Sequence, residues 1–297
     1  MGKITIPSVL KTTANNIRTL MLFKKQYVLT TLLMVSMAFV SFSQTITPTD
    51  GMFRKFASIN CRCELIYTGN TVHAYDPAPP GVPADFHDRT GTLGNNNRVF
   101  SYVDVDSDPT TYNSSTAGFR LNPGEGVAMA TLHWGGRTGA PDGTQFPDLP
   151  GGPEISTLKI SFDGGATYTD ITPDTIRYID ATSVSDPSDF VTASFDITSL
   201  VQANQVLNGF TNITVGNVPL ILRDDAQNNT GGWSMNIVKR NLTFSNKEIS
   251  VFETLVFGSN FSRNFLIPGL VIPSGNTDPL RLAIMAGDGD LGAQDNI

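Results

Sequence analysis

The chain has 297 residues, of which 40% are hydrophobic and only 16% are charged, whereas soluble domains usually carry about 25% charged residues. Gly, Pro, Thr, Ser and Asn stand where Lys and Glu would fill exposed helix faces, which disfavours a long-helix or coiled-coil protein and favours strands joined by turns. The net charge of −7 argues against a duplex nucleic-acid binder, because neutralising phosphates needs a clustered Lys/Arg surface.

Met21–Ser43 has the pattern of a secretory signal peptide. Lys24 and Lys25 form a short basic start, Tyr27–Phe42 is an apolar stretch, and small residues close the segment. The apolar stretch has 16 residues, fewer than the roughly 20 that a membrane-spanning helix needs, so we expect cleavage, with a retained anchor as the alternative. Twenty residues precede Met21, and we expect Met21 to be the true initiator.

Removal of the signal makes the chain more acidic. Residues 1–43 contain five of the 20 basic residues and no Asp or Glu, so the part from Gln44 holds 15 basic and 27 acidic residues, a charge near −12. Such a chain stays soluble and is repelled by anionic membranes. We therefore expect a secreted or cell-surface protein that contacts neither nucleic acid nor, after signal removal, a membrane.

The only two cysteines, Cys61 and Cys63, form a C-x-C pair. Two cysteines cannot build a disulfide framework, and in a strand both would point to one face, too close along the chain for relaxed disulfide geometry. Zinc would need further ligands, yet His73, His87 and His133 are scattered. The spacing argues against a disulfide and a zinc site, and the distance of Cys61 from the apolar stretch argues against lipid attachment.

After the signal, the chain reads as strands separated by turns. We expect strands at Met52–Ile59 and Cys63–Thr68, then a Pro-, Gly- and Asn-rich loop over 76–98, then an edge strand at Val99–Val105. Gly126–Trp134 is the clearest strand. Period-two alternation places four of its side chains on one core-facing side: Ala128, Ala130, Leu132 and Trp134.

A hairpin and a short helical turn are predicted in the second half. Ile155–Phe162 alternates, Asp163-Gly164-Gly165 supplies the positive φ angles of a tight turn, and Ala166–Ile171 is the return strand. Asp196–Val201 reads as a capped helical turn and is the only helix of note. The remaining expected strands are Thr175–Asp180, Phe190–Phe195, Asn212–Val218, Trp233–Lys239, Ile249–Phe257 and Leu280–Met285.

About ten strands spaced by turns predict an all-β fold, namely a two-sheet sandwich of jelly-roll or related type with minimal helix. The expected organisation is a signal peptide over 1–43, lead-in strands with the Pro/Gly/Asn-rich loop over 44–125, and the sandwich core over 126–297. The roughly 245 residues from Met52 onward lie within the single-domain range for sandwiches and barrels.

Five short motifs follow one another in the second part of the chain: AMATLHWGG (Ala128–Gly136), SFDITSLVQA (Ser194–Ala203), GGWSMNIVKRN (Gly231–Asn241), KEISVFETLVFG (Lys247–Gly258) and AGDGDLGAQD (Ala286–Asp295). In order and spacing they resemble the amino-terminal β-domain of large exported surface proteins of Bacteroidetes, which are followed by Ig-like modules and a sorting domain read by the type IX secretion system. The resemblance implies an adhesin-like surface module, and none of the motifs is catalytic.

This chain departs from the family pattern at two places. Lys239-Arg240 replaces the family's aromatic-acidic pair, and the sequence stops at Ile297 without a sorting domain. We therefore expect a chain that is truncated at its carboxyl end.

Two acidic loops offer oxygen ligands of the kind that calcium prefers. The first contains Asp288, Asp290 and Asp295, and the second is VDVDSDP around residues 104–108. Neither has the full calcium-loop pattern with its Gly and terminal Glu, so a solvated acidic turn is the alternative for both. Calcium is the one cofactor left open.

Three further features invite a carbohydrate-related interpretation. Ser161–Ile171 (SFDGGATYTDI) resembles the Asp-box hairpin of sialidases and other β-propeller glycosidases, but a single box with few arginines indicates a structural hairpin. Trp134 and Trp233 could stack on sugars, although their apolar neighbours favour core positions. Asp174-Thr175-Ile176 resembles the short O-glycosylation acceptor pattern of exported Bacteroidetes proteins.

No nucleophile elbow, helical zinc-binding His pair or phosphate-binding Gly loop with Lys is present in the sequence. We predict a non-enzymatic structural or adhesive β-domain of a bacterial cell-surface protein. Its partners would be other modules of the same protein or an extracellular glycan or protein. The alternatives are a carbohydrate-active protein, either a glycan-binding module or a glycoside hydrolase whose paired carboxylates meet only in the fold, and a periplasmic or outer-membrane-associated ligand binder.

Overall fold

The computed structural model describes residues 45–48, 54–75, 100–106, 108–138, 157–173, 175–179, 190–222 and 230–255. The chain divides into two units, Met1–Ser43 and Gln44–Ile297, and every described residue belongs to the second. The expected signal segment and the strand expected at Leu280–Met285 lie outside the described residues. Among the residues that the structure describes, no helix has the length and apolar character needed to cross a membrane.

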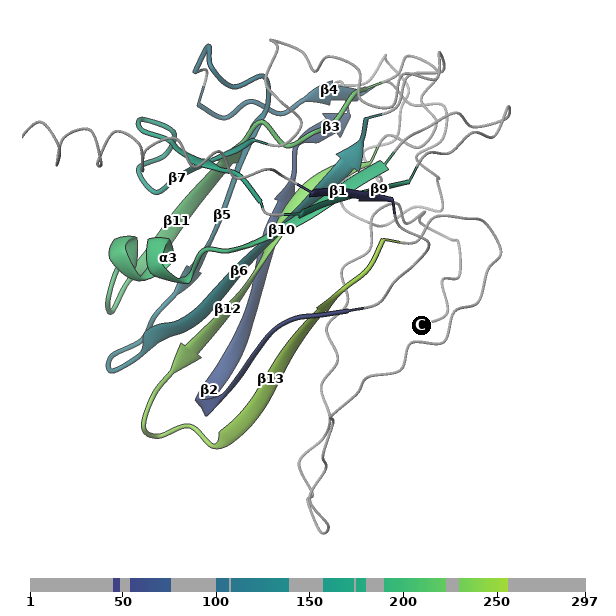
Figure 1. Cartoon of the computed structure of the whole chain (residues 1–297). Coiled ribbons are helices and arrows are strands. Elements are labelled where there is room, and N and C mark those ends of the chain that lie inside the picture. Colours follow the sequence, from purple (N-terminus) through teal and green to yellow (C-terminus); the bar gives the residue numbers. More distant parts are fainter. Residues whose placement is uncertain are drawn as a thin grey trace, which may run out of the picture. The chain divides into compact units, whose positions relative to one another are not determined.

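The described part is built almost entirely of strands, which confirms the all-β prediction (Figure 1). One helix is described, α3 (Thr198–Asn204), and it lies where the capped turn was expected. The strands are β1 (Thr45–Pro48), β2 (Arg54–Thr71), β3 (His73–Tyr75), β4 (Phe100–Tyr102), β5 (Ser114–Arg120), β6 (Gly126–Arg137), β7 (Leu158–Ser161), β8 (Thr169–Ile171), β9 (Thr175–Ile179), β10 (Phe190–Asp196), β11 (Phe210–Gly216), β12 (Gly231–Arg240) and β13 (Asn246–Glu253).

Two larger sheets and one strand pair make up the fold. Seven strands are hydrogen-bonded in the order β1-β9-β10-β6-β12-β2-β13, four in the order β5-β11-β7-β8, and β3 pairs with β4. The short β1 runs parallel to β9, whereas the other described pairs are antiparallel. Strands from both sides of the expected boundary at residue 126 contribute to each large sheet, since β2 lies beside β12 and β5 lies beside β11.

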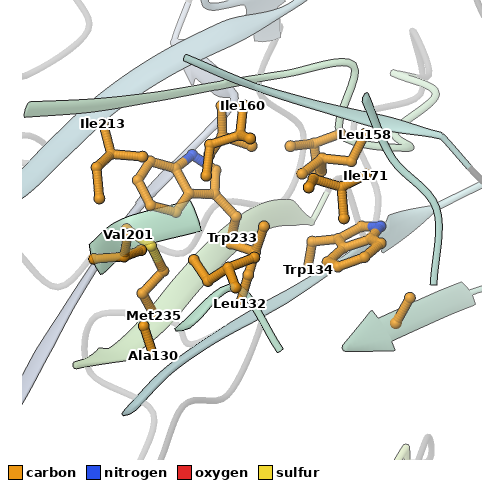
Figure 2. Close-up of a cluster of buried hydrophobic side chains, with 14 of the residues drawn as sticks. Ala130, Leu132, Trp134, Leu158, Ile160, Ile171, Val201, Ile213, Trp233 and Met235 are labelled. Carbon is orange, nitrogen blue, oxygen red and sulfur yellow. The ribbon is translucent and has the colours of Figure 1, made fainter. Parts of the chain in front are cut away.

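The two large sheets enclose one apolar core, part of which Figure 2 shows. Burying a large apolar side chain contributes about 1.5–3 kcal/mol, so this core is the main source of stability. A hydrogen bond of 2.8 Å from Trp233 Nε1 to Ser115 Oγ links β12 to β5 across it. The buried side chains in the figure come from both sheets and from α3: Ala130, Leu132, Trp134, Trp233, Met235, Leu158, Ile160, Ile171, Ile213 and Val201.

The strand β6 departs from the predicted alternation at one residue. Val238 pairs with Met129 and Lys239 pairs with Val127, so Ala128 has no direct partner on β12 and forms a β-bulge. Because of this extra residue, Ala128 packs against a second apolar cluster instead of the main core. The prediction that Ala128 shares the core face of β6 was therefore wrong.

The two strands expected near residues 52–68 form one long strand, β2, that changes partners along its length. Residues 54–62 pair with β13, and residues 63–71 pair with β12. Figure 1 shows β2 turning back at its lower end, where it runs beside β13. Residues 54–62 and β13 thus form a two-stranded unit, which we call the β2–β13 ribbon.

The β2–β13 ribbon packs on β6 and β12 of the same sheet, on the face that points away from the main core. Met129 and Val238 lie on this face, because they alternate with the core residues Ala130 and Ile237. Val251 on the ribbon completes the buried cluster with them and with Cys63. Partly buried ribbon residues surround the cluster: Phe56, Ala57, Ile59, Cys61 and Ile249.

Candidate functional site

Charged and polar side chains gather where the end of the β2–β13 ribbon meets the seven-stranded sheet. We call this group the Glu253 network. Its charged members come from three strands and are Arg54, Arg177 and Glu253. Its uncharged members come from the adjacent strands β10, β6 and β12 and are Ser194, His133, Thr131 and Asn236.

Strand register explains why the uncharged members meet. Ser194 of β10 pairs directly with His133 of β6, and Thr131 of β6 pairs directly with Asn236 of β12. Alternation turns Thr131 and His133 away from the core that holds Leu132. The same local pattern that builds the core therefore lines up a polar row on the opposite face.

The carboxylate of Glu253 is the electrostatic centre of the network. Its Oε1 lies 2.6 Å from Arg54 Nε and 2.6 Å from Arg177 Nη2, and its Oε2 accepts a hydrogen bond from the Ser194 hydroxyl. The Glu253 and Arg177 side chains are only 7% and 6% exposed, whereas Arg54 is 46% exposed. Burying a carboxylate is costly unless it is paired, and the two guanidinium groups supply that pairing.

The hydrogen bonds around His133 determine which ring nitrogen carries the proton. The Ser194 hydroxyl donates its only proton to Glu253, so its oxygen accepts from His133 Nδ1, 3.0 Å away. His133 Nε2 is then an acceptor for the Thr131 hydroxyl at 2.9 Å, and Thr131 Oγ1 accepts from Asn236 Nδ2 at 3.2 Å. The chain of donors is continuous only for a neutral imidazole with its proton on Nδ1.

Burial lowers the pKa of His133 to about 4; the Glu253 carboxylate opposes this shift and the Arg177 guanidinium adds to it. The ring of Phe56, on the ribbon, lies edge-on to the imidazole with 5.4 Å between ring centroids. At neutral pH His133 is therefore uncharged, in agreement with the hydrogen-bond pattern.

The arrangement differs from a Ser-His-acid hydrolase. In that triad the acid accepts a hydrogen bond from one imidazole nitrogen, and the other imidazole nitrogen accepts a hydrogen bond from the serine hydroxyl. Here Glu253 accepts directly from Ser194, and both nitrogens of His133 are engaged by hydroxyl groups. One polar atom of the network has no partner: in the part of the chain that the structure describes, Arg177 Nη1 is buried without a hydrogen bond. The geometry joins the ribbon to the sheet and presents no activated serine.

The acidic loop around residues 104–108 uses its carboxylates within the protein. Asp104 Oδ1 accepts from Ser114 Oγ at 2.9 Å, and Asp106 accepts from the Tyr168 hydroxyl and from the Asp108 backbone N–H. Burial alone would raise the pKa of Asp106, but these hydrogen bonds outweigh it and lower the pKa. Within the described ranges, no group of three or more His, Cys, Asp or Glu is placed to hold a metal ion. The other calcium candidates, Asp288, Asp290 and Asp295, lie outside the described residues.

The predicted hairpin between β7 and β8 is confirmed, but its connection is longer than the expected tight turn, because the return strand begins at Thr169 and not at Ala166. Gly164 and Gly165 have φ angles of 78° and 95°, as the turn requires. Asp163 accepts hydrogen bonds from the hydroxyls of Ser161 and Thr167, and these bonds hold its pKa at about 2. The motif that resembles an Asp box therefore stabilises its own turn.

Both tryptophans are core residues, as predicted. Trp134 and Trp233 are each 2% exposed, so neither indole is available to stack on a sugar. Thr175, in the pattern that resembles an O-glycosylation acceptor, is the first residue of β9 and pairs with Thr45 of β1.

The expectation for the cysteines was wrong, because Cys61 and Cys63 form a disulfide. Their Cα atoms are 5.3 Å apart, within the roughly 4.4–6.8 Å that disulfides span. The strand bends at this point instead of continuing straight, and the sequence contains no signal that marks the bend.

Sequence reasoning also missed the Glu253 network. Arg54 and Glu253 are 199 positions apart, and Ser194 and His133 are 61 positions apart. No short motif contains these residues together, so only the pairing of strands could bring them to one place.

No family model, no curated protein and no solved structure matches the chain. The resemblance to exported surface proteins of Bacteroidetes therefore stays a prediction, and the function is argued from the chain's own residues.

Proposed function

We propose that the chain is an exported, non-enzymatic structural or adhesive β-domain of a bacterial cell-surface protein. The observation that carries the proposal is that the side chains capable of catalysis are hydrogen-bonded to one another inside the fold. Glu253, Ser194 and His133 bind one another where the ribbon meets the sheet, and Phe56 lies against the imidazole. Groups that could run chemistry are thus engaged in stabilising the packing of two layers.

The disulfide supports export. Disulfides form and persist in oxidising places such as the periplasm and cell surfaces, and they are rare in the cytosol. The Cys61–Cys63 bond agrees with the signal pattern of Met21–Ser43, which would carry the chain across the inner membrane. The acidic charge of the part after the signal agrees with a soluble surface module.

The covered surfaces favour a module over a glycan-cleaving enzyme. Both tryptophans fill the core, and the β2–β13 ribbon covers Met129 and Val238 on the outer face of β6 and β12. The partners we propose are other modules of the same surface protein or an extracellular glycan or protein. Calcium at Asp288, Asp290 and Asp295 remains part of the proposal.

Export is tested by expressing the full 297-residue chain with a carboxy-terminal epitope in a Bacteroidetes host. We expect a mature product that begins at Gln44, read by mass spectrometry, and that is cleaved by protease added outside the cell. Replacing Leu32 and Leu33 with Arg should abolish export, because charges in the apolar stretch prevent signal function. Ile4→Arg is the control and should export normally, since it precedes Met21. Export of the double variant would contradict the proposal.

The class of function is tested on the exported product. We expect it to bind extracellular glycans or proteins on an array without releasing reducing sugar from a panel of polysaccharides. Release of reducing sugar that Glu253→Gln abolishes would overturn the proposal in favour of a glycoside hydrolase. Glu248→Gln is the matched control, because Glu248 lies exposed on the same strand.

A further inference from the structure

The Cys61–Cys63 disulfide lies at the point where β2 changes partners. Cys61 pairs with Lys247 within the ribbon, and Arg62 pairs with Asn246 as the last ribbon pair. Cys63 pairs with Arg240 as the first pair with β12. The disulfide therefore brackets the single residue at which β2 passes from the ribbon to the seven-stranded sheet.

The effect of such a disulfide is local. In the chain-entropy model, a disulfide stabilises a fold more when it closes a longer loop, and this one joins residues only two positions apart. It holds the two Cα atoms at 5.3 Å, whereas two residues of an extended strand advance about 6.6 Å. The bond thus maintains the bend through which the ribbon turns back over the sheet.

The two sulfur atoms differ in exposure and surroundings. Cys61 is partly exposed, whereas Cys63 is fully buried, so a thiol from outside reaches the disulfide at Cys61. Lys247 Nζ donates a hydrogen bond of 3.1 Å to the Cys63 carbonyl, which places a positive charge on the backbone of the residue that carries the buried sulfur, while the carbonyl oxygens of Cys61 and Lys247 lie 3.1 and 3.9 Å from Cys63 Sγ. A nearby cation stabilises a thiolate, and a stabilised thiolate leaves faster in disulfide exchange.

We propose that Cys61–Cys63 is a thiol–disulfide exchange site whose substrate is a dithiol and whose state sets the position of the β2–β13 ribbon. A thiolate of the dithiol attacks Cys61 Sγ, the bond between the two cysteines breaks, and Cys63 leaves as a thiolate that takes up a proton. The second thiol of the partner then attacks the mixed disulfide, and Cys61 is released as a thiol. Two electrons and two protons pass from the dithiol, which becomes a disulfide, to the cysteine pair.

Reduction would release the constraint at one end of the ribbon only. The other end stays joined to the sheet by the ion pair of Glu253 with Arg177 and by the hydrogen bond that Ser194 donates to Glu253. Between these ends the ribbon covers Met129 and Val238. Opening the disulfide therefore loosens a cover over an apolar surface, while the main sandwich core on the opposite face stays packed.

Hydrogen exchange with mass spectrometry on the exported chain, before and after treatment with dithiothreitol, tests the proposal. Dithiothreitol is the dithiol probe. We expect backbone amides of residues 54–60 and 246–253 to exchange about ten-fold faster after reduction, and reoxidation to restore slow exchange. Amides of β11 serve as the internal reference and should not change. Unchanged exchange in the ribbon after complete reduction, or equal acceleration in β11, would overturn the proposal.

Two variants separate the exchange site from a passive crosslink. The double variant Cys61→Ser with Cys63→Ser should show the fast ribbon exchange without reductant and no response to it. Lys247→Gln should slow reduction of the disulfide about three-fold, measured by alkylation of the released thiols. Lys55→Gln removes an exposed charge from the same ribbon and should leave the rate unchanged. Equal rates for both lysine variants would contradict the role of Lys247.

Discussion

At the residue scale, His133 shows how the surroundings determine the chemistry of a side chain. A histidine in water titrates near pH 6.5, but loss of water around His133 lowers its pKa to about 4. The ring keeps a single proton on Nδ1, because the Ser194 hydroxyl donates its hydrogen bond to Glu253 and its oxygen therefore accepts from Nδ1. Histidine commonly serves as a general base or metal ligand, but here it is a neutral link between two strands.

This pKa predicts an acid-sensitive stability. Between pH 6.5 and pH 4 the unfolded chain binds a proton at His133 that the folded chain does not, so the free energy of unfolding falls as the pH falls. From pH 7 to pH 5 the loss from this residue should be about 2 kcal/mol. In His133→Gln the loss over the same range should be smaller by about that amount, measured by urea unfolding at both pH values. Equal slopes for the variant and the wild type would contradict the prediction.

At the element scale, the β7–β8 hairpin combines local turn chemistry with one long-range contact. Gly164 and Gly165 both have positive φ angles, which residues with a side chain rarely adopt. Their surroundings differ, however. A Cβ at Gly164 would meet no atom within 4 Å, whereas a Cβ at Gly165 would collide with the side chain of Asp106.

The two glycines make a matched pair of substitutions. Gly164→Ala should cost about 1 kcal/mol of stability, because only the backbone conformation is strained. Gly165→Ala should cause a further loss of about 1–3 kcal/mol, because the acidic loop that carries Asp106 has to shift. Urea unfolding of both variants gives the comparison. Equal losses would mean that the hairpin does not pack against this loop.

At the scale of the whole molecule, the two sheets are held together by apolar packing and by a few directed hydrogen bonds. Trp233 fills the middle of the core, and its Nε1 donates to Ser115 Oγ on the facing sheet. At the edge, Thr68 Oγ1 and Asn70 Nδ2 of β2 donate to backbone carbonyls of β5 at 3.1 and 2.9 Å. These bonds fix how β2 and β5 lie against each other.

Removing the partner of the Trp233 indole tests this link between the sheets. Ser115→Ala should destabilise the fold by about 1–3 kcal/mol, because it leaves a buried N–H without an acceptor. Ser58→Ala, at an exposed ribbon position, should change stability by less than about 0.5 kcal/mol. Thermal unfolding of the two variants beside the wild type measures the difference. A loss for Ser115→Ala no larger than for Ser58→Ala would argue that the hydrogen bond contributes nothing.

Features that depend on neighbouring residues were predictable from the sequence. The alternation in Gly126–Trp134 and the Asp163-Gly164-Gly165 turn identified a core strand and a hairpin, and the structure confirms both except for the position of Ala128. The assignment of Trp134 and Trp233 to the core follows from the same alternation. A side-chain period of two and the positive φ of a turn are local properties, so a few adjacent letters are enough to predict them.

The order of the strands, the bend of β2 and the Glu253 network were decided by the tertiary structure alone. Cys61 and Cys63 become bonded because β2 exchanges one partner for another between them, and those partners are about 180 positions away. Local alternation predicts which residues face inward, but it does not predict which strand lies beside which. By itself the sequence determined an all-β sandwich with a hairpin and one helical turn. Tertiary pairing decided where its charges meet and where it bends, because these features arise from contacts between distant segments.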